Sequence, residues 1–341
     1  MKRPNENNSR LYFDARWNGN HGIARYSRGI YSSIPINAKY LYRKYPPFSL
    51  LSLLLSFRTF RRNSVFYSPG FLAMPFARVQ LITIHDLIQL KYGSFVKRKL
   101  FGVYYRSFLG RRIRKGNIYI ATVSKESRNE ISTLLQIDSE HIHLLPPGLD
   151  KEFIIKDINS LNTVNENRIM CVTSNKEHKN FDYFLEIVKN LKGNWQIDVV
   201  GISEYSESIT LNENFVNFHI DVNETRLLEL YKACRIIVVP SKAEGFCLPA
   251  LEGAALGKAI VHFENLSTIS RIAGSLAFKV TAKASPAEFA RVIESIDFIS
   301  KSAIKQEILR IQSEYSWERT SRELASVLTS ILNAQANKEI K

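Results

Sequence analysis

The chain has 341 residues, 45% of them hydrophobic, and a net charge of +15, a length that suits two α/β domains better than one. Its three cysteines (Cys171, Cys234 and Cys247) form neither a CxxC pair nor a metal-site spacing, which argues against a disulfide framework and favours a reducing compartment. The N-terminus MKRPNENNSR lacks the apolar core of a signal peptide, and the longest apolar stretch, residues 48–57, is far shorter than the ~20 residues that span a bilayer. We therefore expect a protein that is neither secreted nor transmembrane.

The positive charge lies in the first half of the chain. Residues 1–150 contain 24 Lys and Arg against 8 Asp and Glu, a net charge of +16. Residues 151–341 contain 23 against 24, a net charge of −1. This asymmetry predicts that the N-terminal half faces a polyanion or an anionic membrane.

In chain order, short β-rich runs alternate with amphipathic segments of helix length, a pattern typical of parallel sheets covered by helices. In the first half, strands are predicted at residues 11–14, 65–67, 81–84, 119–122 and 143–145, and helices at 22–33 and 124–135. The polar stretch 151–167 is interpreted as an interdomain linker.

A second series of the same kind follows. Strands are predicted at residues 169–173, 196–200, 236–239 and 259–263, and helices at 180–191, 224–233, 248–256, 286–296 and 317–332. Two such arrays predict two Rossmann-like domains, residues 1–155 and 156–315, that face each other across a cleft. Residues 316–341 are expected to form a C-terminal helix that packs back toward the first domain. Ligands of such sheets bind at the carboxyl ends of the strands.

The most informative segment is VVPSKAEGFCLPALEGAALG, residues 238–257, which indicates a strand, a loop, a helix and a glycine stop. Glu244 lies in the loop, and helix periodicity places Glu252 on the same helix face as Leu248. The N–H groups at the helix start suit a diphosphate, and the two carboxylates could accept hydrogen bonds from sugar and ribose hydroxyls. Taken alone, two glutamates eight residues apart are also typical of a solvated loop and a helix surface.

The segment EGFCLPALEGAALG resembles the donor-site signature EGFGLPxLEAMAxG of the GT-B retaining glycosyltransferases of family 4. It differs at Cys247 and Gly253, where the signature has glycine and alanine. Further segments resemble this family in the family's order between residues 22 and 318: GIARY, TIHDL, TVSKES, LPPGLD, EHKN and YSWE. The resemblance implies the GT-B fold, and the TIHDL and KN segments point to its mannosyl- and rhamnosyl-transferase branch.

The resemblance also implies a donor site in the second domain. Glu244 would bind hydroxyls of the transferred sugar, Glu252 the ribose, and Lys179 the diphosphate, whose charge it would neutralise as the leaving group departs. The other implied donor contacts are Gly22, Gly245, Phe246, Cys247 and Leu248. The family often supplies a second basic residue where this chain has Thr173, for which Lys176 or His178 might substitute.

In the first domain, the resemblance places His85 in the catalytic centre beside Glu244 and Lys179. Asp86 could orient its loop or contact acceptor hydroxyls, and His21 precedes Gly22 in the same kind of loop. A lone histidine is often a structural residue, and Gly22 also suits a plain turn.

No DxD motif or metal-ligand cluster is evident, and the resemblance implies a reaction without metal, cofactor or enzymic nucleophile. The departing phosphate would accept the proton of the acceptor on the same face of the sugar. The protein would then supply positioning and charge stabilisation.

The segment at residues 97–115 mixes basic residues with aromatic and aliphatic ones and contains no acid. It resembles a basic amphipathic helix that lies at a membrane interface, although a packed helix with a solvated basic face fits the same pattern. The apolar residues 48–57 could add a second contact. Nucleic acid is the rival polyanion, but its binding signatures are absent from the sequence, so we expect no nucleic-acid partner.

The sequence thus predicts a metal-independent hexosyltransferase, with mannose from GDP-mannose favoured. Its acceptor would be a lipid-linked saccharide in bacterial surface polysaccharide biosynthesis, of the O-antigen, lipopolysaccharide or capsule type. We expect it to be cytoplasmic and peripheral on the inner face of the membrane. Two alternatives stay open: a GT-B nucleotide-sugar epimerase, and a non-catalytic basic protein that binds nucleic acid or membrane.

Overall fold

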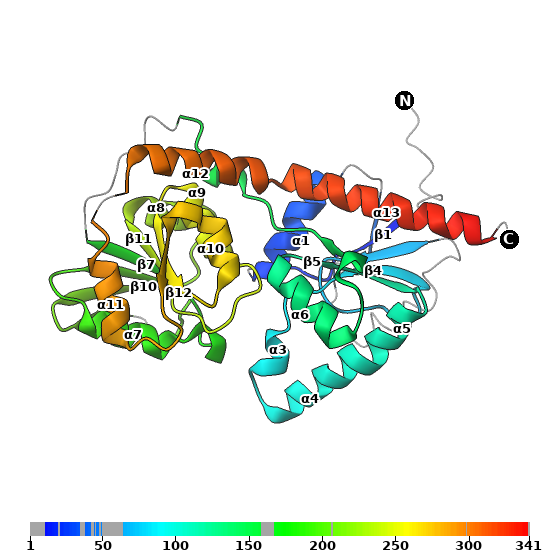
Figure 1. Cartoon of the computed structure of the whole chain (residues 1–341), viewed down its shortest axis with the longest axis horizontal. Coiled ribbons are helices and arrows are strands. Elements are labelled where there is room, and N and C mark those ends of the chain that lie inside the picture. Colours follow the sequence, from blue (N-terminus) through cyan, green and yellow to red (C-terminus); the bar gives the residue numbers. More distant parts are fainter. Residues whose placement is uncertain are drawn as a thin grey trace. The chain divides into compact units, whose positions relative to one another are not determined.

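The structure, a computed structural model, describes residues 11–19, 21–34, 38–41, 44, 46–47, 49, 64–157, 167–205, 207–297 and 299–339. The chain divides into two compact units, Met1–Gly148 with Tyr315–Lys341, and Leu149–Glu314 (Figure 1). The apolar stretch 48–57 lies outside the described residues except for Ser49. Among the described helices, none combines the length and the apolar character needed to cross a membrane.

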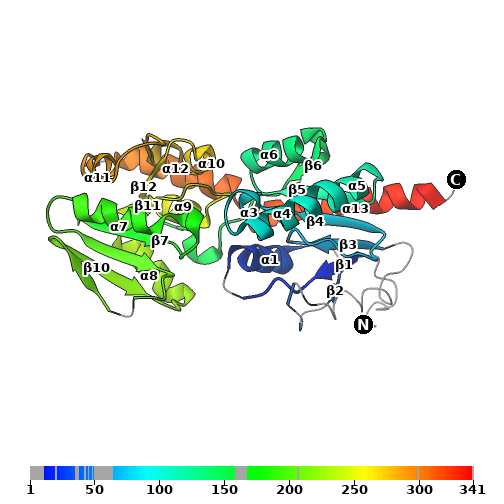
Figure 2. The same cartoon turned by 90° about the horizontal axis from the view of Figure 1, so that it is seen from below.

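The first unit is built on a parallel sheet of six strands in the order β2-β1-β3-β4-β5-β6. The strands are β1 (Leu11–Asp14), β2 (Lys39–Leu41), β3 (Val65–Ser68), β4 (Val79–Thr83), β5 (Ile118–Thr122) and β6 (Ile142–Leu144). All residues of β1, β3 and β4 are buried, as expected for strands covered by helices on both faces. Figure 2 shows α1 and α6 on opposite faces of this sheet.

The helical segments of the first unit are α1 (Gly22–Ser33), α3 (Ile88–Lys91), α4 (Phe95–Val103), the π-helical η2 (Tyr104–Leu109), α5 (Gly110–Arg114), α6 (Lys125–Leu135), η3 (Ser139–His141) and α13 (Trp317–Glu339). Helix α13 packs on α1 where a glycine makes room. A Cβ at Gly29 would lie 2.2 Å from the Trp317 ring, and one at Gly148 would lie 2.1 Å from the Trp317 backbone nitrogen. Thr320 Oγ1 also donates to the carbonyl oxygen of Pro146 at 2.7 Å. The C-terminal helix is therefore part of the first unit.

The second unit has a sheet of seven strands in the order β13-β12-β11-β7-β8-β10-β9, in which only β9 runs antiparallel to its neighbour. The strands are β7 (Arg168–Val172), β8 (Gln196–Val200), β9 (Ile209–Leu211), β10 (Asn214–His219), β11 (Ile236–Val239), β12 (Ala259–Phe263) and β13 (Ala277–Val280). The helices are η4 (Lys151–Phe153), η6 (Glu177–Lys179), α7 (Phe181–Asn190), α8 (Glu224–Ala233), α9 (Leu248–Ala255), α10 (Ser267–Ala273), η7 (Gly274–Leu276), α11 (Pro286–Glu294) and α12 (Lys301–Glu314).

The two units divide after Gly148, whereas the sequence placed a domain boundary after residue 155. The intervening residues pack within the second unit. Phe153 is buried, its ring centroid 5.5 Å from that of Tyr231, and the carbonyl oxygen of Ile155 accepts from Gln312 Nε2 at 3.2 Å. The predicted linker therefore begins with packed residues, and its remaining part, residues 158–166, lies outside the described chain.

Candidate functional site

The strand order of the second unit places two loops side by side. Strand β7 lies at the centre, the chain continues through β8 and β10 on one side, and β11, β12 and β13 follow on the other. The loops after β7 and β11 therefore leave the carboxyl edge of the sheet next to each other. This is the topological switch point at which open α/β sheets bind ligands.

Two hydrogen bonds fasten these loops together. Asn180 Nδ2 donates to the carbonyl oxygen of Pro240 at 3.1 Å, and the backbone N–H of Lys242 donates to the carbonyl oxygen of His178 at 2.8 Å. Asn180 also ends η6 in the left-handed conformation, with a φ of 58°, which asparagine tolerates better than most residues. This asparagine thus turns the chain into α7 and links the two loops.

The junction brings together a partly buried lysine and a glutamate. Lys179 Nζ lies 2.7 Å from Glu244 Oε1, and the side chains are only 21% and 8% exposed. Ser241 Oγ donates to the same carboxylate oxygen at 2.6 Å. Burial lowers the pKa of Lys179, but the neighbouring Glu244 carboxylate more than offsets this, so that the pKa is raised overall. Lys179 is therefore a charged ammonium at neutral pH, in a largely buried position.

Helix α9 begins directly beside this pair. Cys247, at its N-cap, has a left-handed backbone with φ 77° and ψ 77°, and its carbonyl oxygen accepts from the N–H groups of Ala250 and Leu251. Burial raises the pKa of the Cys247 thiol, and the carboxylates of Glu244 and Glu252 raise it further, whereas Lys179 lowers it. Cys247 therefore lies among all three predicted donor-site charges, at the positive end of a helix.

The rest of α9 is packed into the unit. Glu252 is only 3% exposed, so its carboxylate lies beneath the surface of the site. Gly253, the second difference from the resembled signature, has a packing reason in this chain. A Cβ there would lie 2.6 Å from Ile237 Cγ1 and 3.0 Å from Ile260 Cδ1. The isoleucines of β11 and β12 fill the space that an alanine methyl would need.

The position of the expected second cation is occupied by a buried hydroxyl. Thr173 is 8% exposed, and its Oγ1 has no hydrogen-bond partner within the described part of the chain. Of the two suggested substitutes, His178 has a pKa lowered first by burial and next by the charge of Lys179, so its imidazole is neutral at pH 7. Lys176 is exposed at the start of η6. This leaves Lys176 as the candidate second cation of the two.

In the first unit, His85 follows β4 and is held in one tautomer. Its Nε2 lies 2.8 Å from the carbonyl oxygen of Pro69, which can only accept, so Nε2 carries the proton and Nδ1 is left as an acceptor. The ring meets Tyr26 edge to face, with centroids 4.8 Å apart. Burial lowers the pKa of His85 to about 4. The imidazole is therefore neutral at pH 7.

The other predicted residues of the first unit have local structural contacts. His21 caps α1, its Nδ1 accepting from the N–H of Ala24 at 3.2 Å. Asp86 Oδ1 accepts from the N–H of Ile88 at 2.9 Å and so starts α3. Gly22 does not have a positive φ, and a Cβ there would meet nothing within 4 Å. The fold of the unit itself thus does not require glycine at this position.

The predicted donor residues Lys179, Glu244, Cys247 and Glu252 thus meet in the second unit, and His21 lies near enough to lower the pKa of His85 in the first. Ser241 and Asn180 are contributors that the sequence did not assign to the site. A hydroxyl three residues before Glu244 was the available signal for Ser241. Within the described residues, no group of three or more His, Cys, Asp or Glu side chains is placed to hold a metal ion.

Two α/β units with largely parallel sheets, one carrying a charged loop pair at its switch point, fit the GT-B class of glycosyltransferase folds. Solved structures agree over nearly the whole chain. Sucrose-phosphate synthase from Thermosynechococcus elongatus matches with a TM-score of 0.67 and 15% identity, covering 96% of this chain and 100% of that one. HepE from Anabaena in complex with UDP-glucose matches with a TM-score of 0.67 and 14% identity, covering 94% and 99%. These likenesses establish the fold.

The sequence of the second unit gives a family match: residues 166–296 match the model for glycosyl transferases group 1. The O-antigen chain mannosyltransferase RfbU of Salmonella typhimurium is 26% identical over 196 residues, which are 55% of this chain and 53% of that protein. The match therefore spans about half the length of the curated relative.

Proposed function

We propose that the protein is a retaining glycosyltransferase that transfers a hexose from a nucleotide-sugar to a lipid-linked saccharide. The observation that carries this proposal is the 2.7 Å pair of Lys179 and Glu244 beside the start of α9. Lys179 and Ser241 both donate to Glu244 Oε1, which leaves Oε2 to accept hydrogen bonds from sugar hydroxyls. An arriving diphosphate would compete with Glu244 for the ammonium of Lys179.

Mannose is the favoured sugar, with GDP-mannose as the donor. The support is the similarity to an O-antigen chain mannosyltransferase, together with the TIHDL segment at residues 83–87. We place the reaction in the assembly of a bacterial surface polysaccharide. The acceptor would then be a lipid-linked saccharide at the inner face of the cytoplasmic membrane, where the protein would be peripheral.

The chemistry follows from the charges. Lys179 neutralises the diphosphate as the bond to the sugar breaks, and the helix end at Cys247 adds partial positive charge. His85 is neutral at pH 7, since burial lowers its pKa to about 4. It therefore orients hydroxyls by accepting their hydrogen bonds at Nδ1, and it does not act as an imidazolium acid. The leaving phosphate then accepts the acceptor's proton on the same face. We propose that no metal ion is required, and transfer should persist in a chelator.

The test is transfer by Glu244→Gln and Lys179→Ala variants. Loss of one preorganised charge contact in the transition state lowers kcat by about 10²–10³-fold in comparable sites, and we expect that range for each variant. Glu186→Gln is the matched control, because Glu186 forms an exposed pair with Lys189 at 2.6 Å in the same unit. Unchanged transfer by the Glu244 variant would show that the donor site is elsewhere.

The same assay separates the alternatives. A nucleotide-sugar epimerase would release a changed free or nucleotide-bound sugar without any acceptor. A non-catalytic protein would turn over no donor, and salt-sensitive RNA binding would then favour the nucleic-acid interpretation. Acceptor-dependent transfer that retains the anomeric configuration supports the proposal against both.

A further inference from the structure

Helix α4 presents its apolar side chains to solvent. None of its residues is buried, and Val96, Leu100 and Val103 are 65%, 65% and 63% exposed. These three lie at spacings of four and three residues, so they form one stripe along the helix. Phe95, 62% exposed, stands at the N-terminal end of this stripe. A helix of a globular domain ordinarily turns such a stripe toward the core.

The helix is held in place by the segment that follows it. Tyr105 and Leu109 of η2 are fully buried in the core cluster of the first unit, which also contains Ile120, Ile131 and Leu135. Phe101 of α4 also packs against this cluster, so η2 and Phe101 anchor the helix while its apolar stripe is exposed. The exposure of the stripe is therefore a fixed property of the folded unit.

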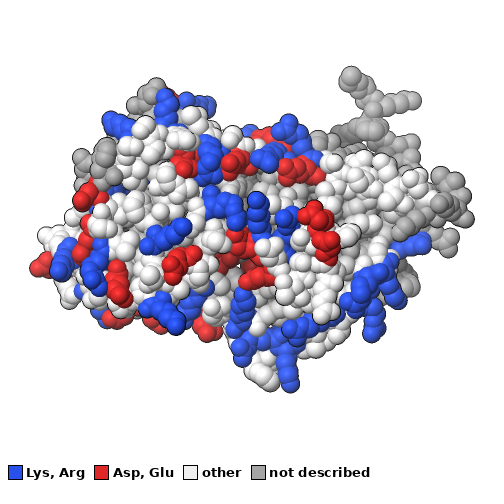
Figure 3. Space-filling view, in the orientation of Figure 1, with Lys and Arg blue, Asp and Glu red and all other residues white. Residues whose placement is uncertain are grey.

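The chain segment that carries the stripe is basic throughout. From residue 93 to residue 116 the chain contains no Asp or Glu, and its cations are Lys97, Arg98, Lys99, Arg106, Arg111, Arg112, Arg114 and Lys115. Arg112 is engaged with backbone carbonyl oxygens, those of Met74 at 3.0 Å and Ala77 at 2.6 Å. The other seven are exposed. In Figure 3, blue side chains gather along the edge formed by α4 and α5.

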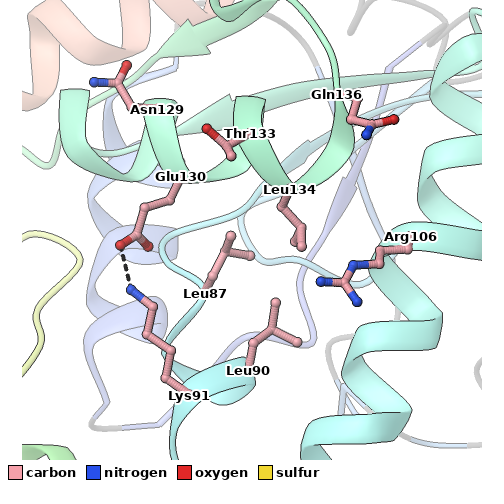
Figure 4. Close-up of a pocket in the computed structure, with 9 residues that line it drawn as sticks. All are labelled: Leu87, Leu90, Lys91, Arg106, Asn129, Glu130, Thr133, Leu134 and Gln136. Atoms are coloured by element: carbon pink, nitrogen blue, oxygen red, sulfur yellow. Dashed lines mark hydrogen bonds and ion pairs between the residues drawn. The ribbon is translucent and has the colours of Figure 1, made fainter.

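Two hollows with apolar floors open beside this helix. One, of about 590 Å³, lies between α3, α6 and η2, and Figure 4 shows Leu87, Leu90 and Leu134 pointing into it, with Arg106 reaching in from the η2 side. The second, of about 430 Å³, also includes Leu90 and Arg106 in its lining, together with Phe95 and Val103. Each hollow thus offers apolar walls and a guanidinium, which suit an acyl chain and its phosphate, and the carboxylate at the first hollow, Glu130, is paired with Lys91 at 2.6 Å.

We propose that α4 and its basic flanks, here called the α4 surface, dock on a bilayer that contains anionic phospholipid. The stripe enters the acyl boundary, and the exposed lysines and arginines contact the phosphates. A nucleic acid would satisfy the cations but would leave the apolar stripe exposed to water, so the observations favour lipid. The inference rests on the proposed function, since it explains how a lipid-linked acceptor reaches the enzyme.

The test is binding of the purified full chain to vesicles of mixed phosphatidylcholine and phosphatidylglycerol, compared with phosphatidylcholine alone. The triple variant Val96→Ser, Leu100→Ser, Val103→Ser keeps every charge, and we expect at least about tenfold weaker binding. The triple variant Lys97→Gln, Arg106→Gln, Arg111→Gln keeps the stripe. Since each cation near an anionic leaflet contributes about 1 kcal/mol, we expect about fivefold weaker binding per substitution.

Leu309→Ser is the matched control, because Leu309 is 50% exposed on α12 of the second unit. It should bind vesicles like the unsubstituted chain, and thermal unfolding should show that all variants are folded. Equal binding of both vesicle types, or undiminished binding by both triple variants, would overturn the inference. The inference would also be overturned if the chain bound RNA in preference to vesicles and the Val96→Ser, Leu100→Ser, Val103→Ser variant bound RNA equally well.

Vesicle binding needs no turnover, which keeps the two proposals separate. If the vesicles bind nothing while Glu244→Gln still abolishes transfer, only the docking surface is wrong. If Glu244→Gln transfers normally while the α4 variants bind vesicles less tightly, the proposed donor site is wrong and the proposed docking surface is supported.

Discussion

Cys247 carries a side chain where the backbone favours glycine. Its φ of 77° and ψ of 77° lie in the left-handed region, which costs a residue with a Cβ about 1–3 kcal/mol. The signature that the segment resembles has glycine at this position, so the difference was visible in the sequence, but the strain was not. Its place near the charges of Lys179, Glu244 and Glu252 indicates that the strain is stored at the proposed donor site.

We expect the free energy of unfolding of Cys247→Gly to lie within about 1 kcal/mol of that of the unsubstituted protein, because relief of strain offsets the loss of the buried thiol. The free energy of unfolding of Cys247→Val should be lower by at least about 2 kcal/mol, since a β-branched residue fits the left-handed region poorly. Equilibrium unfolding in urea measures both. Cys234→Gly is the control, as Cys234 is buried with an ordinary φ of −82° and should be clearly destabilised. A valine variant more stable than the glycine variant would contradict this account.

The sequence predicted the charged site residues, but not the contacts that depend on loop conformation or burial. Lys179 and Glu244 were expected in one site, and they lie 2.7 Å apart. Ser241 was not assigned to the site because its bond to Glu244 depends on the conformation of the loop. His178 was suggested as a cation, but burial lowers its pKa, and burial cannot be judged from a residue's neighbours in the sequence.

At the scale of elements, the proposed donor site depends on two loops that hydrogen bonds hold together. Asn180 performs two tasks there: its left-handed backbone starts α7, and its amide bonds to the carbonyl oxygen of Pro240. It is a positioning residue, because it acts on Lys179 and Glu244 through the loops that carry them.

We expect Asn180→Ala to lower stability by about 1–3 kcal/mol and to raise KM for the donor more than it lowers kcat, because the loops would lose their link and the alanine would be strained. Asn180→Gly keeps the permissive backbone and loses only the amide, so it should be the milder change. Thermal unfolding and donor kinetics measure this. Equal effects of the two variants would assign the whole role to the hydrogen bond.

Elements with strong periodicity were predicted closely, and most strands at the sheet edges were missed. The predicted strand at residues 11–14 and helix at residues 224–233 match β1 and α8. Strands β2 and β9, of three residues each, were not predicted, whereas β6, which is equally short, was predicted at residues 143–145. Strand β10, which pairs with β9 at the edge, mixes buried and exposed residues without clean alternation.

At the scale of the molecule, alternating strands and helices were enough to predict two α/β units. The strand orders, which bring the loops after β7 and β11 together, were not predicted, because strand pairing joins residues far apart in the chain. The division of the units after Gly148 was likewise not predicted. The polar composition of residues 151–167 suggests a linker, but it does not reveal that Phe153 packs against Tyr231 in the second unit.

The central claim is that the loop pair of the second unit binds a nucleotide-sugar, and calorimetric titration with GDP-, UDP- and dTDP-sugars tests it most directly. The account predicts that one of these donors binds to a single site. Its affinity should fall at least about tenfold in Lys179→Ala, since a charge-assisted hydrogen bond is worth about 1.5–3 kcal/mol, and should be unchanged in Glu186→Gln. Binding of none of the three donors, or binding that is indifferent to Lys179, would contradict the account.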